Sequence, residues 1–198
     1  MNKTNRMTAA EFQKYISQNN SGGNDIGQSY CNRISNDRGR SFENLLMKGC
    51  QYYHNRGVAV INKVYEPYIV TKQLPDGRFA GRHCGQAEPD FKGVLSGGRA
   101  IAFEAKSTHK TRIQYGAVTP TQLRWLQEQR KLGALTFVAV NIKEHFYSIP
   151  LYRWEKMKEL YGKKFLMHGD IEQYEVKFDG AVRFLEYEGG GWLPNEEA

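Results

Sequence analysis

The chain has 198 residues, 40% of them hydrophobic, which is enough for one sizeable buried core. Its 28 lysines and arginines outnumber its 21 aspartates and glutamates, and the net charge of +7 favours a polyanionic partner such as nucleic acid. Its three cysteines have no CxxC spacing, so they predict neither a disulfide framework nor a zinc site. No apolar run reaches the roughly 18 residues that span a bilayer, and no signal-peptide core is present, so we expect a cytoplasmic protein without a membrane partner.

The N-terminal part is predicted to be a polar arm followed by a helix. Residues 1–37 are polar, with a short helical candidate at 8–18 and then a stretch rich in Gly, Ser and Asn, so we expect a flexible arm. Apolar residues then repeat at helical spacing from Phe42 to Tyr53, which predicts a helix over residues 41–55.

A strand, a hairpin and two further strands are expected next. The β-branched segment 58–65 predicts a strand, and the turn sequence PDG at 75–77 predicts a projecting hairpin, or stalk, at about 67–87. Residues 91–95 and 99–106 then predict two strands joined by the turn sequence SGG.

The second half of the chain opens with a clear helix signal. Thr119, Pro120 and Gln122 have the spacing of an N-cap, a first-turn proline and a capping box, and the helix is expected to run to Leu132. The apolar run 134–142 predicts a strand buried on both faces. The remaining expected elements are a strand at 146–151, a short charged helix after Trp154, strand-like pieces at 174–178 and 181–187, and a loose tail at 189–198.

The predicted elements follow the order helix, strand, strand, strand, helix, strand, strand. This order indicates one α/β domain over residues 38–188, with a mixed central sheet flanked by helices. No internal repeat interrupts it.

One predicted strand carries an acid and a base on the same face. Alternation along 99–106 places Ala102, Glu104 and Lys106 together, and a hairpin through SGG can bring Asp90 alongside Glu104. Two carboxylates suit a hard cation such as Mg²⁺ or Mn²⁺, which can polarise a phosphodiester and activate a water molecule. Lys106 can orient that water or stabilise developing negative charge. The simpler alternative is a solvated strand face with Asp90 as a turn residue.

The spacing of Pro89 and Asp90 from Glu104, Ala105 and Lys106 resembles the PD-(D/E)xK nuclease signature. The resemblance implies a restriction-endonuclease-like core, ordered as helix, three strands, helix, strand. The elements expected from the sequence have the same order.

A closer resemblance is to the RecU-type Holliday-junction resolvases of Gram-positive bacteria and their phages. It is carried by DRGRSFENLL with QYY within residues 37–53, by AVINK at 59–63 and by FEAKST at 103–108. The resemblance implies a homodimeric, metal-dependent endonuclease that resolves four-way DNA junctions in recombination and repair. It also implies a bacterial cytosolic location, with a phage-encoded form included, and contacts with recombinase or branch-migration proteins.

The resemblance also implies a set of site residues. Asp90 and Glu104 match the metal ligands, Lys106 the catalytic lysine, Glu43 an acidic residue on the first helix, and Gln122 a glutamine on the second. The capping box also accounts for Gln122, and a carboxylate on a helix flank accounts for Glu43.

Basic residues near aromatic ones are the candidate DNA contacts, because cations bind phosphates and aromatic rings stack on unpaired bases. These residues are Arg38, Arg40, Lys63, Arg78, Arg82, Lys110 and Arg112.

The substrate preference stays open at this point. The chain has PDF where the family pattern has a Thr-Asp-Tyr-like element, one extra residue in the SGG turn, and a poorly matching stalk. Two alternatives to a junction resolvase are therefore kept. One is a PD-(D/E)xK endonuclease of restriction or flap type, and the other is a non-catalytic DNA-binding protein that modulates recombination.

Overall fold

The computed structural model describes residues 24–65, 68–83 and 88–187. The chain divides into two units, residues 1–40 and residues 41–198. The candidate helix at 8–18 and the tail at 189–198 lie outside the described residues. Among the described helices, none is both long and apolar enough to cross a membrane.

Helix α2 (Asn24–Asn55) begins much earlier than predicted. The expected start at residue 41 is wrong, because residues 24–37, assigned to the arm, are also helical. No proline occurs between Asn24 and Asn55, so the hydrogen-bonded ladder can continue through residues 24–37, a mainly polar sequence whose apolar residues are Ile26, Tyr30, Cys31 and Ile34. The part after residue 40 buries the predicted stripe, which consists of Phe42, Leu46, Cys50 and Tyr53.

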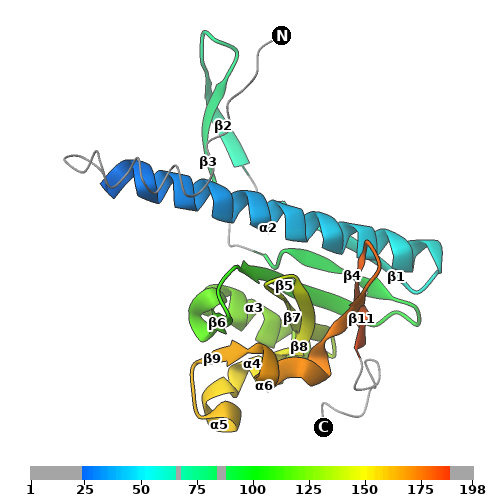
Figure 1. Ribbon diagram of the computed structural model, residues 1–198. Helices are drawn as coiled ribbons and strands as arrows, with labels where there is room; N and C mark the ends of the chain where they lie inside the picture. Colours follow the sequence, from blue (N-terminus) through cyan, green and yellow to red (C-terminus); the bar gives the residue numbers. More distant parts are fainter. Residues whose placement is uncertain (1–23, 66–67, 84–87, 188–198) are drawn as a thin grey trace. The chain divides into compact units, whose positions relative to one another are not determined.

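The central sheet has five strands in the order β1-β4-β5-β7-β8 (Figure 1). The pair β5 and β7 is parallel and the other pairs are antiparallel, so the sheet is mixed, as predicted. Its strands are β1 (Ala59–Lys63), β4 (Phe91–Leu95), β5 (Ala100–Thr108), β7 (Leu135–Ile142) and β8 (His145–Pro150). With α2 and α3 (Pro120–Lys131), they confirm the predicted order of the core.

The two faces of this sheet are covered differently. On one face, α2 and the C-terminal strand β11 (Val182–Tyr187) enclose the main core, where Phe103 lies 4.8 Å from Phe91, 4.4 Å from Phe137 and 4.9 Å from Phe184 between ring centroids. On the other face, Leu126 of α3 packs against Ala102 of β5. The parallel crossover from β5 to β7 thus places α3 on the face that carries Ala102.

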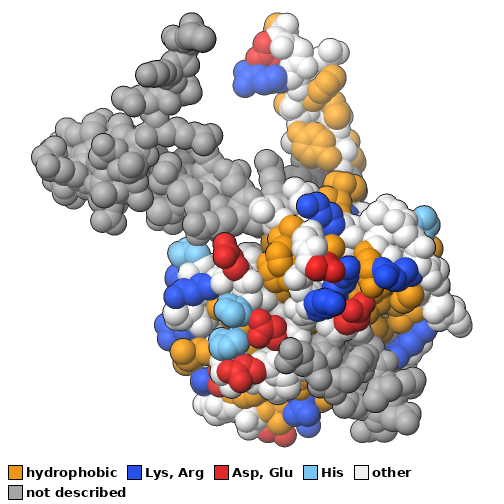
Figure 2. Space-filling model, turned by 45° about the vertical axis from the view of Figure 1, so that its right-hand side comes forward, with side chains coloured by type: hydrophobic (Ala, Val, Ile, Leu, Met, Phe, Trp, Pro, Cys, Tyr) orange, Lys and Arg blue, Asp and Glu red, His pale blue; other side chains and the backbone are white. Residues whose placement is uncertain are grey.

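The predicted hairpin is present as a separate two-stranded sheet. Strands β2 (Tyr68–Gln73) and β3 (Phe79–His83) are antiparallel, and the PDG turn between them closes with Gly77 in the left-handed region at φ +79°. Every residue of β2 is exposed, and hydrophobic side chains are visible along the hairpin (Figure 2). The remainder of the predicted span 67–87 lies outside the described residues.

The C-terminal part contains more short elements than expected. The predicted strand-like pieces become β10 (Val176–Phe178), paired with β11. The charged helix becomes α4 (Leu151–Glu155) and α5 (Met157–Tyr161). The unpredicted elements are β6 (Arg112–Gln114), η1 (Tyr115–Ala117), β9 (Phe165–Met167), α6 (His168–Ile171) and η2 (Glu172–Tyr174). Elements of three or four residues are too short to show a hydrophobic period.

Candidate active site

Asp90 and Glu104 are brought together by the register of β4 and β5. Phe91 pairs with Phe103, so Asp90, which precedes β4, lies across from Glu104. The Oδ2 atom of Asp90 accepts a 2.8 Å hydrogen bond from the backbone N–H of Ala105. The predicted juxtaposition of the two carboxylates across this hairpin is therefore confirmed.

Glu104 is a buried acid with one oxygen unused. Its side chain is 0% exposed, so a solvated strand face is excluded for this residue. Its Oε2 atom accepts hydrogen bonds from Lys106 and Gln122, whereas Oε1 has no hydrogen-bond partner among the described residues. Burial and the charge of Asp90 raise the pKa of Glu104 to about 8, although Lys106 opposes the shift. Such a carboxyl group is costly to ionise unless a cation is added.

Lys106 shares a sheet face with Glu104, as alternation along β5 predicts. Its Nζ atom lies 3.0 Å from Oε2 of Glu104 and 4.0 Å from Oδ2 of Asp90. The ammonium group is thus close to both carboxylates, and its side chain is only 19% exposed. This arrangement places one ammonium group beside two carboxyl groups.

Gln122 joins the helix cap to the acidic site. Its Oε1 atom accepts a 3.0 Å hydrogen bond from the backbone N–H of Thr119, and Thr119 Oγ1 accepts one from the backbone N–H of Gln122, which confirms the capping box. Its Nε2 atom donates a 2.8 Å hydrogen bond to Oε2 of Glu104. The capping role and a role at the site are therefore compatible, because the amide uses its oxygen for one and its nitrogen for the other.

Glu43 is connected to the site through β1. Its carboxylate forms an ion pair with Lys63 at the end of that strand. Lys63 pairs in register with Phe91, and the backbone N–H of Val64 donates to the carbonyl of Asp90 at 2.8 Å. The structure therefore joins Glu43 to Lys63, at the end of β1 that adjoins Asp90.

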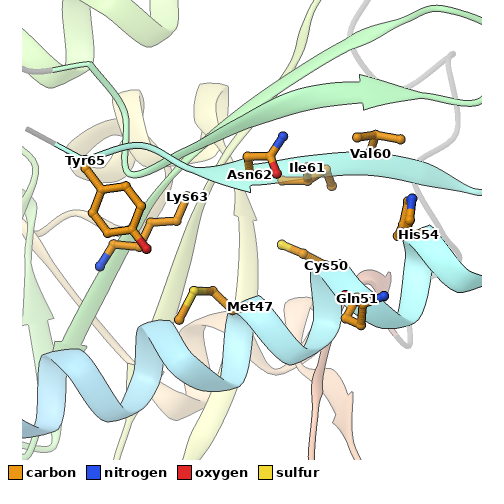
Figure 3. A pocket seen from close by; sticks show the side chains of 9 residues that line it. All are labelled: Met47, Cys50, Gln51, His54, Val60, Ile61, Asn62, Lys63 and Tyr65. Atoms are coloured by element: carbon orange, nitrogen blue, oxygen red, sulfur yellow. The ribbon is translucent and has the colours of Figure 1, made fainter.

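A cleft of about 400 Å³ lies between α2 and β1 (Figure 3). Cys50 of the helix points toward the strand, and Lys63 and Tyr65 stand at one end, whereas Val60 and Asn62 lie on the side of the strand away from the helix. Nζ of Lys63 lies 5.4 Å from the ring centroid of Tyr65. The lining residues are Met47, Cys50, Gln51, His54, Val60, Ile61, Asn62, Lys63 and Tyr65. A cation beside an exposed ring suits a phosphate and an unstacked base.

The candidate DNA-contacting residues fall in separate places. Arg78 and Arg82 lie on the β2–β3 hairpin, where Arg78 pairs with Asp76 at 2.6 Å. Lys110 follows β5, and Arg112 opens β6 with its guanidinium 4.8 Å from the Phe165 ring centroid. Arg38 and Arg40 lie on α2 within the first unit, and their side chains are outside the described ones.

Two contacts near the site were not predicted from the sequence. Lys63 was expected to bind phosphate, but its ion pair with Glu43 and the approach of its Nζ atom to the Tyr65 ring were not foreseen. The residues of the Glu43 pair lie 20 positions apart on different elements, so no local spacing signals the contact.

One comparison with known proteins, the scan against family models, identifies a family. The family model described as Recombination protein U, RecU, matches residues 37–187. Among solved structures, the chain is similar to Hjc of Archaeoglobus fulgidus, a Holliday junction resolvase from an archaeal hyperthermophile, with 16% identity and a TM-score of 0.38 over 58% of this chain and 74% of that one. No curated protein gave a match. Because the family model covers well over half of the sequence, the chain belongs to the RecU family.

Proposed function

We propose that this protein is a metal-dependent endonuclease that resolves four-way DNA junctions by paired phosphodiester hydrolysis, in recombination and repair. Family membership supports the reaction class. The observation that carries the site assignment is the fully buried Glu104, whose Oε1 atom has no partner among the described residues and which lies across from Asp90. A buried carboxylate oxygen of this kind is available to coordinate a cation.

The donor set fits a hard divalent cation. Asp90 and Glu104 offer carboxylate oxygens, the donors that Mg²⁺ and Mn²⁺ prefer, and these two residues would hold the metal. When bound, such a cation supplies polarisation of the phosphodiester and a lower pKa for the attacking water. The raised pKa of Glu104 fits this assignment, because a cation favours the ionised form that burial disfavours.

Lys106 and Gln122 would position and stabilise the reacting groups. The ammonium of Lys106 can donate to a water or to the charged phosphoryl oxygens while it stays 3.0 Å from Glu104. Gln122 holds Oε2 of Glu104 from the first turn of α3, so Oε1 is left for the cation. Glu43 would act through Lys63, by orienting that cation toward the phosphate next to Asp90.

Substrate binding is assigned to basic residues around this site and on the hairpin. Lys63, Lys110 and Arg112 would contact phosphates near the reacting bond, and Arg78 and Arg82 would contact the junction from the hairpin. We extend the same role to Arg38 and Arg40. Each contact would release a counterion, so binding should weaken as salt increases.

Two equivalent strands must be cut to resolve a four-way junction, which favours a homodimer. Val60 and Val94 pair across β1 and β4, and they are 54% and 48% exposed on the sheet face that α3 only partly covers. We assign this apolar pair to the contact with a second copy. Val94→Lys should shift the mass in multi-angle light scattering from dimer to monomer, and an unchanged mass would remove this face from the interface.

The test of the proposed reaction compares a four-way junction with linear duplex of equal length, with Mg²⁺ and with EDTA. Paired symmetric nicks in the junction, only with Mg²⁺, are expected. Equal cutting of both substrates would indicate an endonuclease of restriction or flap type, and binding without cutting in either Mg²⁺ or Mn²⁺ would indicate a DNA-binding modulator.

A further inference from the structure

A second cluster of metal-binding groups lies outside the carboxylate site. It consists of His145 at the start of β8, His168 at the start of α6 and Glu175 after η2. One potential ligand atom from each residue lies within 4.8 Å of the others. Figure 2 shows two histidine side chains beside acidic ones on the surface of the molecule. The cluster shares no residue with the Asp90, Glu104 and Lys106 set.

The donor types of this cluster differ from those of the carboxylate site. Two imidazoles and one carboxylate form the ligand set of many three-ligand zinc sites, in which a water completes the tetrahedron. Mg²⁺ prefers oxygen donors and is disfavoured here. We propose that His145, His168 and Glu175 form a binding site for Zn²⁺, separate from the nuclease metal.

Contacts around the cluster already orient its members. Nδ1 of His145 lies 2.8 Å from Oε1 of Glu175, and the rings of His145 and His168 have centroids 4.8 Å apart. The hydroxyl of Tyr147 lies 2.6 Å from Nδ1 of His168. When Nδ1 carries the proton, the unprotonated Nε2 of His168 can bind a metal, which is how outer partners usually fix a zinc-bound imidazole.

Tyr147 is suited to hold the imidazole because it is almost completely buried, at 1% exposed. Oε1 of Glu172 lies 3.4 Å from Nε2 of His168 and adds negative charge on that side.

The cluster needs only side-chain adjustment to bind zinc. Tetrahedral zinc with bonds of about 2.0–2.1 Å separates its ligand atoms by roughly 3.3–3.5 Å, which lies within the 4.8 Å spread of this cluster. The side chains of His145 and His168 are 52% and 47% exposed, so they have room to turn. A bound ion would connect β8, α6 and the segment before β10, three elements of the C-terminal part.

The test measures zinc directly and not cleavage. Full-length wild type and the double variant H145A/H168Q are titrated with Zn²⁺ in competition with a chromogenic chelator, and thermal unfolding is followed with Zn²⁺ and with EDTA. Gln at 168 keeps a polar partner for Tyr147. The wild type should bind one zinc ion more than the double variant, and zinc should raise its Tm. Loss of the two ligands should weaken this site by more than the roughly 100-fold that loss of an outer partner causes.

The matched control is H54A/H109A, which removes two exposed histidines outside the cluster. It should keep the wild-type zinc stoichiometry and Tm shift. Glu175→Gln, which can still accept a hydrogen bond from His145, should lose the same zinc ion and guards against misfolding of the double variant. Equal zinc binding by wild type and both cluster variants would overturn the proposal, as would a wild type whose Tm does not respond to zinc.

Discussion

Two antiparallel hairpins that are neighbours in the sequence have opposite surroundings. The β4–β5 hairpin lies inside the five-stranded sheet, and its paired Phe91 and Phe103 are both 0% exposed. The β2–β3 hairpin stands as its own two-stranded sheet, with Tyr68 and Phe79 47% and 58% exposed. An isolated two-stranded hairpin is at best marginally stable in water. The same local pattern therefore produces a buried part of the core sheet in one case and an exposed two-stranded sheet in the other.

This difference in burial matches the different roles that we propose for the two hairpins. Metal ligands and a catalytic lysine have to be held to a fraction of an ångström, which a packed sheet provides. A hairpin with exposed aromatic and basic side chains can adjust to a branched DNA surface. We therefore propose that β4–β5 carries the chemistry and that β2–β3 recognises the junction.

The largest expected effect concerns Asp90. Asp90→Asn should lower junction cleavage by about 1,000-fold or more, because a bound metal contributes several kcal/mol to such reactions. Junction binding in a gel-shift assay should stay within a few fold of wild type, since the basic surface is unchanged. Full cleavage by the variant would refute the assignment of Asp90 as a metal ligand.

A pair of glycine variants compares the two hairpins directly. A Cβ atom at Gly93 of β4 would lie 2.1 Å from the carbonyl oxygen of Val60, and one at Gly81 of β3 would lie 2.3 Å from that of Ile69. Gly93→Ala should lower the free energy of global unfolding by roughly 1–3 kcal/mol, because the central sheet must shift. Gly81→Ala should leave urea unfolding of the core unchanged, because the disturbance stays local. Equal losses of unfolding free energy in the two variants would contradict the difference in burial between the two hairpins.

Removal of the exposed hairpin should affect recognition more than chemistry. Deletion of residues 68–83 with a short Gly-Ser link should weaken binding of four-way junctions by about tenfold or more, equivalent to roughly 1.4 kcal/mol. Binding of linear duplex, measured at the same salt concentration, should change less. If both substrates lose affinity equally, the hairpin has no special part in junction recognition.

Glu104 should give the metal-free protein a characteristic pH dependence. Its folded pKa of about 8 lies above the ordinary value of 4.5, so the folded state binds the extra proton and wild-type stability falls as pH rises through this window. Glu104→Gln cannot be ionised, so it should not lose stability as pH rises. In EDTA at pH 8, the Tm of the variant should exceed that of wild type by at least about 2–4 °C, which is the shift that 1 kcal/mol causes in a chain of this size. The gain should vanish near pH 5.

The control for this titration lies on the exposed hairpin. The hydrogen bond from the Arg78 side chain lowers the pKa of Asp76, which is fully exposed. Asp76→Asn should therefore show no Tm gain at pH 8. A gain that is the same at pH 5 and pH 8 for Glu104→Gln would show that the effect comes from packing and not from charge.

The smallest effect is expected at the turn between β7 and β8. Lys143 and Glu144 both have positive φ, at 49° and 70°, a conformation that costs a non-glycine residue about 1–2 kcal/mol. Glu144→Gly should stabilise the packed sheet by up to about 1 kcal/mol in urea unfolding, without changing junction affinity. A destabilised variant would mean that Glu144 makes a compensating contact.

Much of the fold followed from local sequence. The Thr119–Gln122 capping box, the PDG turn ending in Gly77 and the placement of Glu104 and Lys106 on one face were all predicted and are present. These features depend on residues two or three positions apart, where backbone geometry alone sets the contact. The start of α2 was missed because polar residues and glycines greatly outnumber the apolar ones in its first 17 residues, although Ile26, Tyr30 and Ile34 lie four positions apart.

What the sequence by itself determined, then, is the order of elements and the identity of the charged strand. Only the tertiary structure decided that Gln122 serves both its helix cap and Glu104, and that Glu43 reaches Lys63. The gathering of His145, His168 and Glu175 was likewise invisible in the sequence. Such contacts join residues far apart in the chain, and they depend on strand register and helix packing, which local periodicity does not specify.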